Sequence, residues 1–211
     1  RSEEKDVKDL ILRMRQSLDK IESCTMISEV MGNEGNAARA YFEGLSRLVH
    51  PEFIFQGRSR RPPKDEFNSM LSLGYSILMN EIYGKLENKG LNPYFGFIHS
   101  DKEKHPTLAS DMMEEWRATI VDALVMSLIN GHEIHTEHFW HDRDKPGYYL
   151  TKEGLTIFLR KYDKKMQKAV QYLDYIDYAA TFRQSIDLQI NELAKAIEEG
   201  DASIYHPIWL R

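Results

Sequence analysis

The stretch Ile27–Leu45 reads ISEVMGNEGNAARAYFEGL and predicts an amphipathic helix over about residues 25–48. Its apolar side chains recur at spacings of three and four residues, which places them on one helix face. The position that continues this face, three residues after Met31 and four before Ala38, is Glu34. A carboxylate on a buried face is costly unless it is paired, protonated or bound to a metal. Glu34 is therefore a candidate functional residue, and the stripe around it comprises Ile27, Val30, Met31, Ala38, Tyr41, Phe42 and Leu45.

Helical spacing recurs along most of the remaining chain. Valine is scarce, with six residues, and strand-like alternation is almost absent. No internal repeat or low-complexity linker divides the 211 residues, which suffice to bury a core without disulfides. We expect an all-α fold and a single helical domain over residues 1–211, as a fragment of a longer protein. The further helices are expected at about 4–22, 66–88, 107–129, 152–168 and 172–199, with Asp65 and Thr151 as N-caps and Gly200 at the last C-terminus.

The predicted helix over residues 107–129 carries a second anomaly of charge. Its apolar stripe continues towards the helix start into Glu114 and Asp111. These two acids are three residues apart and therefore share a helix face. Glu115 and Asp122 fall elsewhere on the same helix and are expected to be ordinary surface charges.

His99 supplies a third unusual position, because it follows the apolar run Gly96-Phe97-Ile98 rather than a polar stretch. Carboxylates with one imidazole suit Mn²⁺ or Mg²⁺, which prefer oxygen ligands with at most some nitrogen. The competing interpretation is a buried network of acids and bases, for example Glu34 paired with an arginine. Periodicity alone leaves both interpretations open and names no reaction.

Six segments together resemble a known family. They are Met31–Phe42 (MGNEGNAARAYF), Gly57–Asp65 (GRSRRPPKD), Leu71–Tyr75 (LSLGY) preceded by Asn68, Asn92–His99 (NPYFGFIH), Leu108–Arg117 (LASDMMEEWR) and Tyr149–Gly154 (YLTKEG). In this order they resemble the motifs of the CRISPR-associated Cas1 (Cas-one) integrases. The resemblance spans about residues 31–154, and the flanking helices are compatible with it.

The resemblance implies a metal-dependent DNA endonuclease and integrase that inserts new spacers into CRISPR arrays by transesterification. It implies Glu34, His99 and Glu114 as ligands of Mn²⁺ or Mg²⁺, and Asp111 as a further acid of the catalytic site, either supporting the ligands or replacing one. Prespacer and repeat DNA and the small adaptation protein Cas2 (Cas-two) are the implied partners. Family members carry an N-terminal β-rich domain that helps to build a homodimer. This sequence resembles the helical catalytic domain without it.

The densest basic cluster is Arg58, Arg60, Arg61 and Lys64. These side chains are candidates for phosphate contacts, with salt-sensitive binding. Pairing with acids such as Glu52 or Asp65 is an equally weighted alternative. Lys102 and Arg117 are weaker candidates for DNA contacts, since each lies three residues after a predicted ligand and the matching family positions tend to be basic.

Composition limits the class of protein. The net charge of −5 argues against a uniformly basic nucleic-acid binder but allows a local basic groove. One cysteine, Cys24, excludes a disulfide framework and a cysteine-rich zinc site and favours a reducing, cytoplasmic setting. No apolar run reaches membrane-spanning length.

Two other interpretations involve different residues. His132, His135, His138 and His141 recur every three residues, but this step drifts around a helix and matches no regular zinc spacing. A di-metal bundle of the ferritin type would need two Glu-x-x-His pairs, and no histidine has a glutamate three residues before it. A non-catalytic interaction domain, with its acids locked in salt bridges, remains the alternative function.

Overall fold

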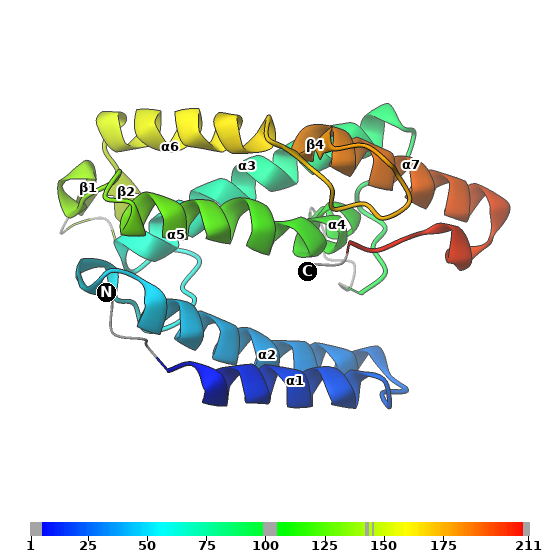
Figure 1. Cartoon of the computed structure of the whole chain (residues 1–211), viewed down its shortest axis with the longest axis horizontal. Coiled ribbons are helices and arrows are strands. Elements are labelled where there is room, and N and C mark those ends of the chain that lie inside the picture. The colour runs from blue at the N-terminus through cyan, green and yellow to red at the C-terminus, as the bar shows by residue number, and fades with distance from the viewer. Residues whose placement is uncertain (1–5, 99–104, 142–143, 145, 209–211) are drawn as a thin grey trace. The chain divides into compact units, whose positions relative to one another are not determined.

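Helices form most of the molecule, and the computed structural model describes residues 6–98, 105–141, 144 and 146–208 (Figure 1). The expected all-α class is confirmed. The α-helices are α1 (Lys8–Ile21), α2 (Ile27–Leu48), α3 (Glu66–Asn88), α4 (Thr107–Arg117), α5 (Ala123–Asn130), α6 (Lys152–Met166) and α7 (Phe182–Glu199). The short strands are β1 (Phe139–His141), β2 (Tyr148–Leu150), β3 (Ala169–Val170) and β4 (Ala180–Thr181). Short 3-10 turns cover Pro51–Phe53, Thr136–His138 and Ala202–Ile204, and a π-helical segment covers Ala118–Asp122.

Local capping chemistry fixes several helix ends where the sequence predicts them. The Asp65 carboxylate accepts the Asn68 backbone N–H at 2.7 Å at the start of α3. The Thr151 hydroxyl accepts the Gly154 N–H at 3.2 Å at the start of α6. Gly200 ends α7 in the left-handed region, at φ 65°. These predicted caps are confirmed.

The last helix is ten residues shorter than expected, because α7 begins at Phe182 and not at residue 172. Thr181 and Gln184 form a reciprocal cap in which the Thr181 hydroxyl accepts the Gln184 N–H at 3.2 Å and the Gln184 side chain accepts the Thr181 N–H at 3.0 Å. The preceding residues pair as β3 and β4. The predicted start of this helix is wrong, because the cap formed by Thr181 and Gln184 lies inside the stretch whose apolar spacing predicted a helix from residue 172.

The predicted helix over residues 107–129 is also interrupted. The π-helical segment Ala118–Asp122 separates α4 from α5, and the inserted turn shifts the helix faces after it. α3 passes close to this segment, since a Cβ on Gly74 would overlap the Val121 side chain. Glycine at this position permits the close approach.

The described chain forms two compact units, residues 1–72 with 125–155 and residues 73–124 with 156–211. In the first unit α1 and α2 lie side by side (Figure 1). Leu10 is 1% exposed and lies against Gly44 of α2. The single domain expected from the sequence is not tested by this division and stays a prediction.

The apolar stripe of α2 is buried only in part. Phe42 is 6% exposed and Ala38, Tyr41 and Leu45 are half-buried, but Ile27 and Met31 are 57% and 43% exposed. The expectation that the whole stripe is buried is therefore wrong for its N-terminal half. Periodicity predicts a face but cannot predict how far its covering elements reach.

The second unit has a dense aromatic and aliphatic core. Trp116 of α4 is fully buried and meets Phe182 of α7 edge to face, with ring centroids 6.1 Å apart. Leu78 and Ile82 of α3 and Phe158 of α6 are also fully buried. Within the described residues, no helix combines the length and hydropathy needed to cross a membrane.

Candidate functional site

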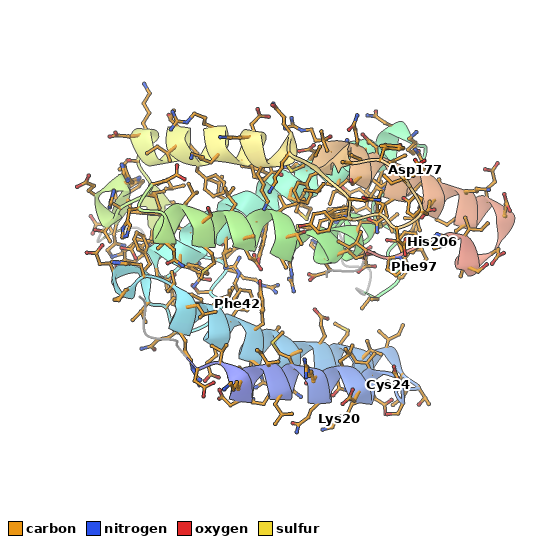
Figure 2. The ribbon with its side chains drawn as sticks, viewed as in Figure 1. Lys20, Cys24, Phe42, Phe97, Asp177 and His206 are labelled. Carbon is orange, nitrogen blue, oxygen red and sulfur yellow. The ribbon has the colours of Figure 1, made fainter. Side chains whose placement is uncertain are left out.

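Asp111 holds the loop that leads towards His99. Its Oδ2 atom accepts the backbone N–H groups of Phe97 at 2.6 Å and Ile98 at 3.0 Å. Phe97 of this loop is labelled in Figure 2. The hydroxyl of Thr107, at the start of α4, accepts the Gly96 N–H at 2.9 Å and donates to the Tyr94 carbonyl at 2.6 Å. The loop is therefore fastened to α4 through its backbone.

Gly96 is required by this close approach. An added Cβ would lie 2.7 Å from Asp111 Oδ2 and 2.8 Å from the Thr107 Cβ. The side chains of Phe97 and Ile98 stay 59% and 44% exposed, so the loop is held by hydrogen bonds and not by burial of its apolar groups. His99 and Lys102 lie outside the described residues.

Glu114, one turn further along α4, forms a fork with Arg117. The two guanidinium nitrogens lie 2.9 Å and 2.6 Å from the two carboxylate oxygens. The guanidinium also lies over the Tyr75 ring, 5.9 Å from its centroid, and the Tyr75 hydroxyl donates to Asp122 at 2.5 Å. Glu114 is thus a half-buried carboxylate with a neighbouring positive charge.

The sequence-based prediction assigned Glu115 and Asp122 to the surface, and it did not foresee their hydrogen bonds. Asp122 is 1% exposed and accepts from Tyr75. Glu115 accepts the Gln189 side-chain amide at 2.8 Å, the Ile208 backbone N–H at 3.1 Å and the Tyr205 hydroxyl. The surface assignment is wrong for Asp122 and incomplete for half-buried Glu115, because the partners come from distant segments.

Glu34 lies in the first unit, whereas Asp111 and Glu114 belong to the second. Glu34 is half-buried on α2, and a Cβ added at the adjacent Gly35 would meet only open space. Among the residues that the structure describes, no three His, Cys, Asp or Glu side chains gather in a group able to hold a metal ion. The structure brings Asp111 and Glu114 together on one helix, and the wider ligand set stays a prediction.

The donor chemistry of α4 suits a hard divalent cation. A carboxylate offers about four lone-pair positions, and the Arg117 fork uses two of those on Glu114. Carboxylate oxygens are ligands that Mg²⁺ and Mn²⁺ prefer. The Glu114 carboxylate therefore has the oxygen chemistry that such a cation prefers, next to its arginine partner.

The basic cluster divides into two kinds of arginine. Arg58 is half-buried and donates to Asn68 Oδ1 at 2.9 Å, to the Ser72 hydroxyl at 3.1 Å and to the Ser59 carbonyl. Arg60 and Arg61 are exposed. Arg58 thus supports the loop, whereas the DNA contacts expected of Arg60 and Arg61 stay a prediction.

The histidine tract has local roles. His138 is 8% exposed and its Nδ1 atom accepts the His135 backbone N–H at 2.9 Å. His141 Nδ1 lies 3.0 Å from the Gly147 carbonyl, and its ring stacks on Tyr148 at 4.8 Å. His132 adopts a positive φ of 53° after α5. These contacts shape a turn and a hairpin.

Comparison with solved structures first assigns the fold to a class, that of Cas1 proteins and casposases. A casposase bound to its integration product superposes with a TM-score of 0.80 and 26% identity, over 93% of this chain and 57% of the casposase. A Cas6-RT-Cas1–Cas2 complex gives a TM-score of 0.87 and 28% identity, over 97% of this chain and 22% of the matched chain.

Sequence comparison then identifies the family. Residues 1–164 match the family model described as CRISPR associated protein Cas1. The CRISPR-associated endonuclease Cas1 of Mycobacterium tuberculosis is 42% identical over 198 residues, which cover 94% of this chain and 59% of that protein. The chain therefore belongs to the Cas1 family, as its motifs indicate, and spans a little over half the length of this relative.

Proposed function

We propose that this chain is the catalytic part of a metal-dependent DNA integrase and endonuclease that inserts spacer DNA into CRISPR arrays. The observation that carries the proposal is the pair of acids on α4, Asp111 fastening the loop before His99 and Glu114 presented one turn away, in a chain of the Cas1 family. The likeness to a casposase bound to its integration product supports integration as the reaction. The Cas1–Cas2 complex among the structural relatives supports Cas2 as a partner.

In this proposal Glu34, His99 and Glu114 hold Mn²⁺ or Mg²⁺, and Asp111 orients the loop that carries His99. The bound cation supplies charge stabilisation at the phosphate under attack and favours deprotonation of the attacking hydroxyl. These residues thus place carboxylate and imidazole ligands beside the DNA.

The proposed reaction is an exchange of phosphodiesters. A prespacer 3′-hydroxyl loses its proton and forms a bond to the phosphorus of the repeat, while the bond to the repeat's own 3′-oxygen breaks and that oxygen takes a proton. With water in place of the hydroxyl, the same exchange is strand cleavage. Arg117, which forms the fork with Glu114, adds positive charge beside this carboxylate and is proposed as a DNA contact.

The direct test uses a branched DNA that mimics the half-integrated product, incubated with the chain and either Mn²⁺ or chelator. We expect metal-dependent strand transfer or cleavage that falls about 100-fold or more in Glu34→Gln and in His99→Ala. Glu198→Gln, an exposed acid at the end of α7, is the matched control and keeps the wild-type rate. Equal activity in the Glu34 and Glu198 variants would contradict the site assignment.

A non-catalytic interaction domain is the second candidate function, and the Glu114–Arg117 fork favours it. A fork of this kind can lock an acid in a structural salt bridge. In that case a melting curve of the folded chain would not shift with Mn²⁺. Under the integrase proposal, Mn²⁺ raises the melting temperature of the wild type but not of Glu114→Gln.

A further inference from the structure

The β1–β2 hairpin exposes a pair of aromatic side chains that the proposed chemistry does not use. Trp140 and Tyr149 are direct cross-strand partners, 44% and 38% exposed. Their rings stack with centroids 5.0 Å apart and planes 30° apart. Large aromatic side chains exposed as a contiguous pair often mark a binding surface.

This aromatic pair sits on a firmly anchored hairpin. On the other face Phe139 meets the buried Phe53 edge to face at 6.1 Å. The Thr151 N–H donates to the His138 carbonyl at 2.8 Å and fixes the base of the hairpin. The Tyr149 hydroxyl donates to the Pro146 carbonyl at 3.2 Å. The rings are therefore preorganised, which lowers the entropy that a ligand must overcome.

The exposed basic loop lies against the same hairpin, within the same unit. The Tyr148 N–H donates to the Pro63 carbonyl at 3.0 Å. A Cβ on Gly147 would lie 3.0 Å from both the Pro62 Cβ and the Tyr149 hydroxyl. The two prolines are flanked in sequence by Arg61 and Lys64. Two basic residues thus adjoin in sequence the prolines that contact the hairpin.

The basic side chains are available while their backbone is fixed. Arg60, Arg61 and Lys64 are exposed, and none forms an ion pair within the part of the chain that the structure describes. Buried Asn68 anchors the loop, since its side chain accepts the Ser59 N–H at 3.0 Å and donates to the Gly57 carbonyl at 3.0 Å. The expected alternative partner Asp65 instead bonds the Asn68 side chain and backbone.

We propose that the hairpin and this loop bind single-stranded DNA, with an unpaired base stacked on Trp140 and Tyr149 and the adjoining phosphates on Arg60, Arg61 and Lys64. Only unpaired nucleotides offer a base face to such a pair, whereas a duplex covers its faces by stacking. A chain with net charge −5 that exposes these three cations, with no ion pair to any described residue, has an anionic ligand as their complement. The inference deepens the proposed function by naming where an unpaired strand lies.

The test measures DNA binding under conditions that prevent metal-dependent catalysis. Fluorescence anisotropy measures the affinity of the full chain for a 20-nucleotide oligothymidine and for a duplex of the same length. Chelator is present in both titrations. We expect Trp140→Ala to weaken single-strand binding about 5- to 150-fold and duplex binding little, because stacking contributes about 1–3 kcal/mol per base. Trp140→Phe, which keeps an aromatic face, should recover most of the affinity.

The basic side chains of this surface are tested separately, through the salt dependence of DNA binding. Arg60→Ala combined with Arg61→Ala should weaken binding to both DNA forms and lower the slope of log affinity against log salt by about 1.4 for the single strand. Tyr178→Ala, an aromatic side chain 53% exposed in the other unit, is the matched control and binds as the wild type does. Circular dichroism melting curves confirm that each variant is folded.

Unchanged single-strand affinity in the folded Trp140→Ala variant would overturn the inference, as would an equal loss in Tyr178→Ala or an equal loss for the duplex. The first result would assign the aromatic pair to a protein contact. Failure here is distinguishable from failure of the proposed function. Strand transfer on branched DNA with Mn²⁺ can persist without this surface, and single-strand binding can persist in an inactive Glu34→Gln variant.

Discussion

At the scale of single residues, the acids Asp111 and Glu114 have different partners although they share one face of α4. Asp111 is bound by two backbone N–H groups of the preceding loop. Glu114 is bound by the Arg117 guanidinium. A carboxylate that accepts backbone N–H groups orients a loop, whereas the Glu114 carboxylate is held by a side chain of its own helix. We therefore expect Asp111 to act through loop position and Glu114 through direct ligation.

Asp111→Asn should weaken the attachment of the loop to α4 while leaving the volume of the side chain nearly unchanged. The amide oxygen can replace one acceptor but carries no charge, so two charge-assisted hydrogen bonds weaken. We expect a loss of about 1–3 kcal/mol in the free energy of unfolding, measured by denaturant titration. Hydrogen exchange at Phe97 and Ile98 should accelerate more than in Glu198→Gln. Unchanged exchange at these two amides would contradict the role of Asp111.

Gly96→Ala tests the same loop by steric means. The new Cβ would fall 2.7 Å from Asp111 Oδ2 and 2.8 Å from the Thr107 Cβ, so the loop must move off α4. We expect a lower melting temperature and weaker Mn²⁺ binding. Gly84→Ala on α3 is the control, because its Cβ would meet open space and it should stabilise by about 0.5–1 kcal/mol. Similar shifts in both variants would contradict the close approach.

At the scale of elements, the capping residues Asp65, Thr151 and Gly200 were more predictable than the long-range contacts that the helices make. Asp65, Thr151 and Gly200 act on their own helix within a few residues, so sequence alone places them. The buried role of Asp122 depends on Tyr75, which lies 47 residues away. No local pattern encodes such a contact.

The α1–α2 pair is held in part by an exposed ion cluster in which Arg47 binds Asp9 and Glu43. Hydrogen bonds to Arg47 lower the pKa of both acids below their ordinary values near 4. Acids with lowered pKa stabilise the folded state above their unfolded pKa, and the contribution is lost as pH falls through the folded pKa. The protection factors of amides in α1, which correct for the slower chemical exchange in acid, should therefore fall below about pH 4. Arg47→Met should diminish this step but not remove it, because Arg13 also pairs with Glu43 at 3.0 Å and lowers its pKa. An identical pH profile in that variant would contradict the role of Arg47.

The C-terminal tail is fastened to α4 through Glu115. Burial, and next the charge of Glu115, raise the pKa of the Tyr205 hydroxyl, so it stays a donor at all ordinary pH values. Tyr205→Phe should cost about 1–3 kcal/mol of unfolding free energy, because a half-buried carboxylate loses a donor. Tyr178→Phe provides the exposed comparison and should change the denaturation midpoint little. Equal midpoints in the two variants would show that Tyr205 contributes no stability through Glu115.

At the scale of the whole molecule, the family and the all-α class were predictable because ordered motifs and helical periodicity each extend over long stretches. The interruption of the predicted helix over residues 107–129 was not predictable. The π-helical segment there lies close to Gly74 of α3, which is far away in sequence. The stripe of α2 predicted burial for Ile27, which is 57% exposed, because a sequence pattern does not specify the reach of a covering helix. Glu34 and the acids of α4 belong to different units, so their joint role rests on the proposed function.

The measurement that tests the central claim most directly is calorimetric titration of Mn²⁺ into the folded chain, the Glu34→Gln variant and the Glu114→Gln variant. We predict one site in the wild type and affinity reduced about 10-fold or more in each variant, with Glu198→Gln unchanged. A folded wild-type chain that binds no Mn²⁺, or binds it equally after both substitutions, would contradict the assignment of these acids to a metal centre.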